Sequence, residues 1–442
     1  MCEYDNPLPT PKLGALGSLD VGSKLFNPSK WLSSWRLTQE AKSLAAACRA
    51  VVSGGRIWVV QVEGCWRRTY TGSYEMRRSV MESQENIKLK QQEPKTWPKV
   101  AIIVLNWNGW QDTIECLESL QRLTYPNYQI IVVDNGSTDD SVEKIKAWAQ
   151  GEIPGESKFI HFNPNNKPLE WIEYDRITAE AGGAIDKETR ISEFPSNRKL
   201  VFIQTGENLG FAGGNNVGVR YALRHSYNYV CILNNDVVVN PEFLTTLVDY
   251  ANRVPNVGIA GPLICSYYKP QKVESMGGAI SLWTGRVPRL GSRLLVTKVQ
   301  TKLPFFVHYV SGCAMLIDTK VFKTIGFFDE QFFLSFEDTD FCYRARQAGF
   351  LVQVVLASQV WHKESASTPT PIGRYYSVRN RLLFMKKHAK LWHWITFLIC
   401  YILGSIKQAI WLALGRKDLR SALAIGKGVL DGLKILMLKG GL

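Results

Sequence analysis

Four short polar segments interrupt the apolar runs of this 442-residue chain, and they contain the residue types that bind charged ligands and move protons. In an open α/β sheet, ligands bind at the carboxyl ends of the strands. We therefore predict that the four segments converge on one rim, although Asn, Asp and Gly are also ordinary turn residues. The segments are Asn106-Trp-Asn-Gly109, Asp134-Asn-Gly136, the glycine-rich stretch 208–216 with Asn234-Asn-Asp236, and Glu337-Asp-Thr-Asp340.

The segment around Asp236 is a candidate metal and phosphate site. This carboxylate lies beside two amides inside the apolar run 230–239, where polar side chains need a specific reason. Such a group suits a hard divalent cation that is already bound to phosphates, and the cation would neutralise charge on a departing diphosphate. A buried turn capped by Asn and Asp is the alternative. His362 follows the last predicted strand and is a candidate ligand or base, with a structural role as its alternative.

The adjacent carboxylates Glu337 and Asp338 are candidates for acid–base chemistry. In an extended chain their side chains point to opposite sides. One of them would then face the site as a general base for a hydroxyl proton, while the other holds structure.

The glycine-rich stretch Gly210–Gly214 does not match the dinucleotide fingerprint G-x-G-x-x-G, and the chain has no P-loop. Its glycines either let the backbone approach a diphosphate or form the tight start of a helix.

The elements that position these segments follow an alternating order. Continuous apolar runs at 100–105, 129–133 and 200–203 are typical of strands buried on both faces. Helical spacing between the first two runs, at 110–123, predicts a β-α-β unit and hence a right-handed parallel sheet. We expect further strands at 230–239, 257–260, 307–317 and 351–356. Further helices are expected at 241–252, 319–325 and 338–348, and the stretch 208–216 is expected to lead into a helix that ends at about Arg224.

Three regions are predicted along the chain. Residues 1–95 show no persistent period and form an extension that is either disordered, with the natural start near Met81, or a small accessory region. Residues 96–370 form the α/β domain, interrupted by a polar, proline-containing insertion at 163–198. Residues 371–442 are predicted to be helical, with an almost wholly apolar segment at 391–406.

The charge of the chain indicates an anionic partner. The net charge is +14, and many basic residues lie near the apolar C-terminal segments. That pattern favours an anchor lying in an anionic membrane surface over a tilted membrane span or a soluble core helix. No zinc-finger or basic-zipper spacing points to nucleic acid. Nine widely spaced cysteines and the lack of a signal-peptide pattern indicate a reducing compartment, and hence the cytoplasmic face of the membrane.

Together these motifs resemble the family-2 inverting glycosyltransferases with a GT-A fold, in particular the rhamnosyltransferase-like members. The resemblance covers residues 99–136 and 200–365. It runs through the segments named above and through Ser311-Gly-Cys-Ala-Met-Leu-Ile317 and Gly326-Phe-Phe-Asp-Glu330. It implies a Rossmann-like mixed sheet flanked by helices, followed here by the helical membrane-associating region.

The resemblance also implies roles for individual residues. The donor would be a dTDP- or UDP-sugar, with Asp134 facing the pyrimidine base. Asp236 would match the last Asp of the D-x-D motif and hold Mg²⁺ or Mn²⁺. Because Asn234 replaces the first acid, His362 becomes a more plausible second ligand. The remaining residues implied to contact the donor are Asn106, Asn108, Asn208, Gly214, Asn215 and Asn235.

On the acceptor side, the resemblance implies that Asp338 is the base. Glu337 and Asp340 would support or bind the acceptor, and Arg344 and Arg379 are candidates for phosphate on a lipid-linked acceptor. The expected activity is metal-assisted, inverting transfer of a rhamnose-like sugar to a glycan or lipid-linked acceptor in surface polysaccharide synthesis. The alternatives are a non-catalytic scaffold with the same fold, a dinucleotide-dependent oxidoreductase and a glycoside hydrolase.

Overall fold

The computed structural model describes residues 97–155, 157–292, 294–299, 304–363 and 370–437, and two short strands before them. Those strands, β1 (Val52–Ser53) and β2 (Arg56–Ile57), pair antiparallel within a first unit, residues 1–82. The predictions for the rest of residues 1–95 lie outside the described residues. The second unit, residues 83–442, contains all the other described helices and strands.

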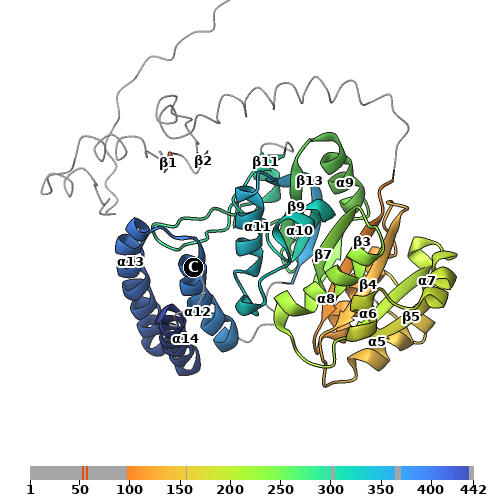
Figure 1. The fold of residues 1–442 in the computed structure, drawn as a ribbon, viewed down its shortest axis with the longest axis horizontal. Helices are drawn as coiled ribbons and strands as arrows, with labels where there is room; N and C mark the ends of the chain where they lie inside the picture. The colour runs from red at the N-terminus through yellow and green to blue at the C-terminus, as the bar shows by residue number, and fades with distance from the viewer. Residues whose placement is uncertain are drawn as a thin grey trace, which may run out of the picture. The chain divides into compact units, whose positions relative to one another are not determined.

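Four parallel strands form the centre of the sheet (Figure 1). They are β3 (Val100–Asn106), β4 (Tyr128–Asp134), β6 (Lys199–Gln204) and β7 (Tyr229–Asn234), and their apolar side chains are almost completely buried. Alternate residues of one strand face opposite sides. In β3, Ile102 packs into the core on one face and Ile103 into the core on the other. Both faces are covered, which explains why these strands are continuous apolar runs.

The sheet is mixed rather than wholly parallel. Its order is β11-β13-β9-β12-β7-β3-β4-β6-β5, and with β8 and β10 it has eleven strands among the described residues. Strand β12 (Ala314–Asp318) lies antiparallel between β7 and β9 (Val257–Ser266). The remaining strands are β8 (Val237–Val239), β10 (Val273–Ser275), β11 (Phe305–Phe306) and β13 (Leu351–His362).

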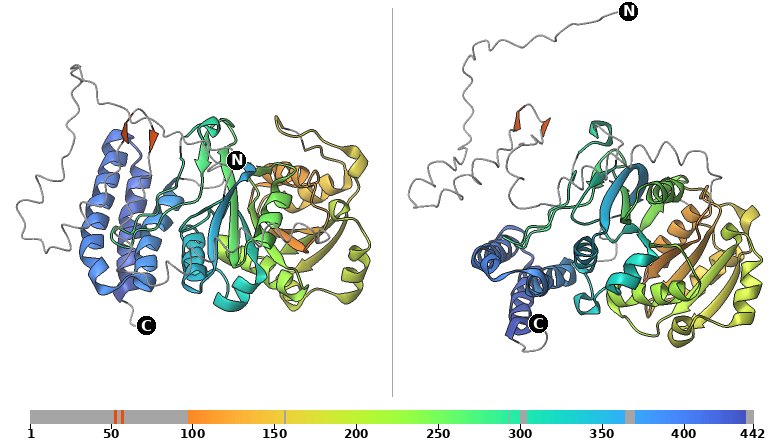
Figure 2. Two further views of the ribbon diagram at one scale, coloured as in Figure 1. Left: turned by 90° about the horizontal axis from the view of Figure 1, so that it is seen from above. Right: turned by 45° about the horizontal axis from the view of Figure 1, so that its top comes forward.

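Helices cover both faces of the sheet (Figures 1 and 2). One face packs against α4 (Trp110–Leu120), α5 (Ser141–Gln150) and α9 (Phe243–Arg253), which contribute side chains such as Trp148 and Leu247. The other face packs against α8 (Gly210–Arg224), α10 (Thr319–Ile325) and α11 (Glu337–Gln347), through Tyr221, Phe322 and Phe341. The predicted three-layer α/β architecture is therefore confirmed.

The polar insertion extends the edge of the sheet. It contains β5 (Glu170–Asp175), which pairs parallel with β6, and the short helices α6 (Arg176–Ala181) and α7 (Ile185–Ser192). The one-turn 3₁₀ helices Pro164–Asn166 and Ser196–Arg198 lie at its two ends. The insertion is thus neither a bare loop nor a separate subdomain, because its one strand is part of the main sheet.

Three helices follow the sheet and lie side by side (Figure 2). They are α12 (Thr370–His388), α13 (Leu391–Ile410), which continues through a π-helical turn at Trp411–Gly415, and α14 (Leu419–Met437). The segment Leu391–Gly415 is 25 residues long and apolar enough to cross a membrane by length and composition. It is longer than the predicted 391–406. One face of α13 buries Phe397 and Tyr401, while Ile395, Ile399 and Leu403 on the opposite face are exposed.

Candidate active site

The parallel strands end level with one another and so bring their last residues together. Cα register pairs Asn106 with Asp134, and Asp134 with Gln204, which in turn pairs with Asp175 of the insertion. Because the carboxyl ends of parallel strands meet at one edge, the first two predicted segments lie on the same rim.

Asn106 and Asp134 form a buried hydrogen-bonded pair. The Asn106 Nδ2 donates to Asp134 Oδ1 at 2.8 Å, and Thr113 Oγ1 donates to Asn106 Oδ1 at 2.7 Å. Asp134 also accepts from the Ser137 hydroxyl at 2.6 Å and, through Oδ2, from the Ser137 amide at 3.0 Å. Asn108 Oδ1 accepts from the Thr138 amide at 2.7 Å. Both asparagines and Asp134 therefore fix the turn 134–138 against the end of β3.

A second amide cluster joins this turn to α8. Asn135 Nδ2 donates to Asn208 Oδ1 and to the Gly210 carbonyl, each at 3.1 Å. The helix must approach closely, since a Cβ at Gly214 would lie 2.5 Å from Leu105 Cδ1 and 3.0 Å from Asn135 Cγ. Asn215 is fully buried, and its Oδ1 has no hydrogen-bond partner.

Asp236 lies between two strand ends and faces His362. Strand β8 pairs with β13 so that Val237 is opposite His362, and this places His362 Nε2 3.3 Å from Asp236 Oδ1. The His362 Nδ1 contacts Glu274 at 2.9 Å, and Arg289 Nη1 lies 3.2 Å from the same carboxylate. His362 is the last residue of β13, because that strand extends six residues beyond the predicted 351–356.

The environment of His362 favours its protonated form in the absence of a cation. Burial alone would lower its pKa, but the Cys313 sulfur and the hydrogen bonds with Asp236 and Glu274 raise the pKa well above its usual value. The Glu274 carboxylate contacts Nδ1 of the ring and so holds the other nitrogen, Nε2, toward Asp236. Metal-ligating histidines in proteins are commonly oriented in this way, by a carboxylate at the nitrogen that does not bind the metal.

Two buried oxygens lie at the first and last positions of the expected metal motif. Asn234 Oδ1 has no hydrogen-bond partner, and the contact of Asp236 Oδ1 is the one with His362 Nε2 at 3.3 Å. Carboxylate and amide oxygens with an imidazole suit a divalent cation. Within the described ranges no three His, Cys, Asp or Glu side chains form a complete ligand cluster. The ligand types present at Asp236, His362 and Asn234 are thus ones that fit a divalent cation.

Glu337 and Asp338 lie in the first turn of helix α11 rather than in an extended segment, which corrects the prediction that they point to opposite sides of a strand. Asp338 Oδ2 accepts from the Gly312 amide at 2.9 Å, and its Oδ1 accepts from the Thr339 amide at 2.6 Å. Burial raises the pKa of Asp338, and it raises the pKa of Glu337 well above its usual value, with a further contribution from the Asp338 charge. Asp338 is partly exposed, and its Oδ1 also accepts from the Thr339 hydroxyl at 3.1 Å, so Oδ2, with the single bond from Gly312, is the oxygen that keeps a lone pair.

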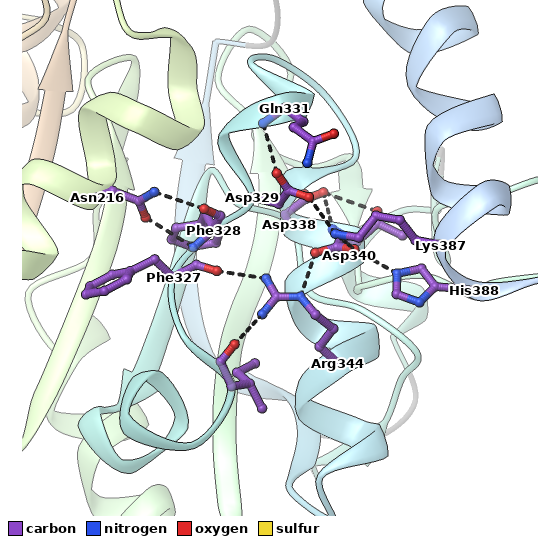
Figure 3. A network of polar contacts seen from close by, with 12 residues as sticks. Asn216, Phe327, Phe328, Asp329, Gln331, Asp338, Asp340, Arg344, Lys387 and His388 are labelled. Atoms are coloured by element: carbon purple, nitrogen blue, oxygen red, sulfur yellow. Dashed lines mark hydrogen bonds and ion pairs between the residues drawn. The ribbon is translucent and has the colours of Figure 1, made fainter. Parts of the chain in front are cut away.

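Asp340 points away from this site into a buried ion-pair network (Figure 3). It contacts Arg344 Nε at 2.7 Å, His388 Nε2 at 2.7 Å and Lys387 Nζ at 3.0 Å. Although burial alone would raise its pKa, these cations lower the pKa of Asp340 to about 2. Asp340 therefore fastens α11 to α12 rather than facing an acceptor.

The predicted phosphate-binding arginines are held by internal contacts. Arg344 also donates to the carbonyls of Ile325 and Phe327, each at 2.8 Å, so all three of its nitrogens have partners within the protein. This arrangement argues against phosphate binding by Arg344. Arg379 Nη1 donates to Asn380 Oδ1 at 2.8 Å.

The turn at Gly312 connects the candidate base to the candidate metal site. Its amide binds Asp338, while the next residue, Cys313, accepts a hydrogen bond through its carbonyl from the Asn234 amide at 2.9 Å. A Cβ at Gly312 would lie 3.3 Å from Asp338 Cβ and 3.2 Å from Phe211. One tight turn thus fixes the separation between the end of β7 and the start of α11.

A cavity of about 560 Å³ opens at this rim. Amides of the strand ends form one wall, and aromatic and aliphatic residues of 333–334, α12 and α14 form the other. Sequence reasoning identified the amides but missed the opposite wall, for which the pair Tyr375-Tyr376 was the available signal. The lining includes Trp107, Asn135, Asn208, Asn234, Asn235, Phe211, Phe333, Ile372, Tyr375, Tyr376 and Lys427.

Fold and site together give an α/β protein with an amide-lined cavity at the carboxyl ends of its strands, and a turn at Gly312 that joins this rim to the Asp338 carboxylate. Residues 101–168 match the family described as Glycosyl transferase family 2, and residues 189–381 match Glycosyltransferase like family 2. The chain belongs to glycosyltransferase family 2, and its mixed sheet is of the GT-A type. The gap between the two matches falls within the insertion.

Similar proteins act in glycan assembly. A dTDP-rhamnosyl transferase of Shigella flexneri is 27% identical over 205 residues, which cover 43% of this chain and 64% of that protein. A low-salt glycan biosynthesis hexosyltransferase of Haloferax volcanii is 29% identical over 219 residues, covering 48% and 69%. An N-acetylglucosaminyl-diphospho-decaprenol L-rhamnosyltransferase of Mycobacterium tuberculosis is 24% identical, covering 46% and 72%. The chain thus spans slightly less than two thirds of the Shigella protein.

One solved structure with low similarity is a mannosyltransferase from Pyrobaculum calidifontis in complex with GDP-Man and Mn²⁺. It is 13% identical with a TM-score of 0.43, and the match covers 81% of this chain and 96% of that one.

Proposed function

We propose that the protein transfers a sugar, with inversion, from a nucleotide-sugar donor to a hydroxyl of a glycan or lipid-linked acceptor. One observation carries this proposal. A single turn, 311–313, joins the amide-lined rim at the end of β7 to the carboxylate of Asp338. Family membership supports the reaction class, and this arrangement supports a donor pocket at the rim with Asp338 as the base.

The donor would bind along the amide rim. Asp134 Oδ2 accepts only the Ser137 amide, so it keeps a lone pair for a pyrimidine N–H. Asn135 and Asn208 line the cavity with Asn235, whose Nδ2 donates to Thr113 Oγ1 at 3.0 Å. Because these amides are already fixed by internal hydrogen bonds, little side-chain entropy is lost when a donor binds.

Asp236 and His362 would hold a divalent cation, with Asn234 Oδ1 as a further oxygen. When bound, such a cation supplies charge neutralisation for the diphosphate leaving group. Within the protein, Glu274 would hold the His362 ring in place, and burial of Asp236 would keep competing water away.

Asp338 would accept the proton of the acceptor hydroxyl. The acceptor oxygen forms a bond with the anomeric carbon while the bond from that carbon to the diphosphate breaks, and the electron pair leaves with the diphosphate. The transition state resembles an oxocarbenium ion. A base on the face opposite the leaving group gives inversion, and the hydrogen bonds from Gly312 and Thr339 would hold the carboxylate there.

A lipid-linked acceptor at a membrane surface is the setting that we favour. The wall of the cavity opposite the amides is made of Ile372, Tyr375, Tyr376 and Lys427, which suits an apolar tail with an anionic head group. The exposed apolar face of α13 would lie in the membrane. Sedimentation with vesicles tests this setting: binding should require anionic lipid and fall with salt, and a protein that stays in the supernatant with anionic vesicles would contradict it.

Rhamnose carried by dTDP or UDP is the donor that we favour, on the strength of the rhamnosyltransferase relatives. The test is to incubate the purified chain with a panel of nucleotide sugars, with and without Mn²⁺ or Mg²⁺, and to measure nucleotide release with and without an acceptor. We expect metal-stimulated release with one donor. Binding of glycans without release from any donor would instead favour the non-catalytic scaffold.

A further inference from the structure

The turn that precedes the candidate base has an unusual backbone. Three non-glycine residues, Phe333, Ser335 and Phe336, have φ values of 61°, 70° and 76°. Phe333 is the centre of a γ-turn with φ 61° and ψ −59°, closed by a hydrogen bond of 2.6 Å from the Leu334 amide to the Phe332 carbonyl. L-residues rarely adopt such conformations, and they persist only where surrounding groups hold them.

One side chain from the C-terminal helices holds this turn. Asn380 of α12 is fully buried, and its Nδ2 donates to the carbonyls of Phe332, Leu334 and Ser335 at 2.7, 2.8 and 2.7 Å. Its Oδ1 accepts from Arg379. Because carbonyls only accept hydrogen bonds, the amide orientation is fixed, and a carboxylate in its place would repel all three oxygens.

The same face of α12 packs along the rest of the turn. Tyr376 stacks on Phe333 with ring centroids 5.1 Å apart, and Phe384 packs against Phe336 at 5.8 Å. Further along the helix, Lys387 and His388 bind Asp340, as Figure 3 shows. Residues four and eight positions apart lie on one helix face. One face of α12 therefore packs along the whole turn and holds it in place.

The turn also contacts the donor side of the site. The Phe333 carbonyl accepts from the Phe211 amide at 2.7 Å, at the start of α8, and Phe333 itself lines the cavity. Two residues after the turn, Asp338 binds Gly312. The conformation of 332–336 therefore sets the direction in which α11 begins and where its first-turn carboxylates point.

We propose that Asn380 is a positioning residue for sugar transfer: its amide holds the strained turn 332–336 and so fixes Asp338 in the orientation that removes the acceptor proton. This inference rests on the proposed function of Asp338 as base. It extends that function to a residue of the helical region, which neither contacts the donor pocket's amides nor reacts itself.

The test compares Asn380→Leu, which keeps the side-chain size but removes the donors, with Asn127→Leu as a matched control. Asn127 also donates its amide to a backbone carbonyl, that of Trp97 at 2.6 Å, but at the amino end of β4. We expect Asn380→Leu to lower kcat about 30- to 300-fold, of the order of losing a general base, with donor Kd changed less than about threefold. The control should lose thermal stability without this loss of kcat.

A double-mutant cycle separates positioning from general destabilisation. In an Asp338→Asn background, Asn380→Leu should lower the residual rate by less than about threefold, since two residues that act as one unit are not additive. An equal fold-loss in both backgrounds would overturn the proposal. If Asn380→Leu does not fold, Asn380→Ser, which keeps one shorter donor, should give an intermediate kcat, and an unchanged kcat in that variant would also overturn it.

A readout independent of activity distinguishes this proposal from the proposed function. Hydrogen exchange at the amides of 334–339 should be at least about tenfold faster in Asn380→Leu and unchanged in Asn127→Leu. Unchanged exchange at 334–339 overturns the inference whether or not the enzyme transfers sugar. Faster exchange in a protein that releases no nucleotide from any donor would mean that Asn380 holds the turn and that the proposed function has failed.

Discussion

The site has two sides that are built by different physical means. We call the strand ends the donor wall, and the turn 332–336 with the start of α11 the base wall. The donor rim consists mainly of amides at the ends of parallel strands, held by hydrogen bonds between near neighbours in the sheet, such as that from the Asn106 amide to the Asp134 carboxylate. The base side is a strained turn and a helix start, held by charges and an amide from α12, such as Lys387 and Asn380. Hydrogen bonds between amides tolerate changes of pH and salt, whereas the buried charges of the base side depend on their partners. The donor wall is therefore a property of the sheet, and the base wall depends on the C-terminal helices.

The largest expected effect separates chemistry from donor binding. Asp338→Asn removes the proposed base, so kcat should fall about 10²- to 10⁴-fold while donor Kd stays within a few-fold. Glu337→Gln is the matched control. Burial raises the pKa of Glu337 well above its usual value, so a neutral amide resembles its protonated form and should cost little. Steady-state kinetics with calorimetric donor titration tests both variants, and a donor affinity that fell in step with the rate would assign Asp338 to binding.

The next effect tests whether the base wall depends on α12. Asp340→Asn leaves Arg344 and His388 without a carboxylate and Lys387 with only that of Asp329, and it should lower the free energy of unfolding by about 3–5 kcal/mol, the range for a broken buried ion pair. Urea unfolding measures it. A comparable change at the donor rim, Asn108→Ala, should cost only about 1 kcal/mol, because it removes a neutral bond near the surface. Equal losses of unfolding free energy in Asp340→Asn and Asn108→Ala would contradict the proposed difference between the two walls.

The same carboxylate makes the stability of the base wall depend on acid. The folded pKa of Asp340, about 2, lies below the unfolded value of about 3.9. Its contribution to stability is therefore present above pH ~4 and lost as the pH falls toward 2. The difference in unfolding free energy between the parent chain and Asp340→Asn should shrink over this window. A difference that stayed constant would mean that the ion pairs do not lower the pKa.

A smaller effect concerns the cation that we propose at Asp236 and His362. Glu274→Gln would leave both ligands in place but weaken the hold on the imidazole ring, so Mn²⁺ affinity should fall about 10- to 100-fold. Mn²⁺ titration in the presence of nucleotide diphosphate measures the change. Asp236→Ala should abolish the metal-dependent part of donor binding. Metal affinity that is unaltered in both variants would exclude this pair as the cation site.

The smallest effect concerns the pH dependence of turnover. Burial raises the pKa of Asp338, and a base must be ionised to act, so kcat should rise with pH through a value above that of an ordinary aspartate. Thr339→Val removes the hydroxyl donor to Asp338 Oδ1, so the acidic limb of the kcat–pH profile should shift to still higher pH. A shift of this limb to lower pH would contradict the assignment of Asp338 as the titrating group.

The donor wall could be predicted from local sequence and the base wall could not. Apolar runs that end in Asn106, Asp134 and Asn234 indicate strands and their carboxyl ends directly, because pattern and burial follow from near neighbours in the chain. Glu337 and Asp338 were recognised as chemical groups but assigned the wrong local geometry. Asp340 was predicted to support or bind the acceptor, and the structure instead shows it bound to Arg344, Lys387 and His388, which lie four, 47 and 48 positions away.

By itself, the sequence determined the α/β class, the buried strands, the helical C-terminal region and most of the polar groups at the rim, because each of these follows from hydrophobic periodicity or short motifs. Only the tertiary structure decided that the insertion lengthens the sheet, that Glu274 stands behind His362, and that Asn380 holds the turn before Asp338. These are contacts between residues up to 88 positions apart. Such pairs are selected by packing and by the cost of burying unpaired polar groups, and neither leaves a periodic signal in the chain.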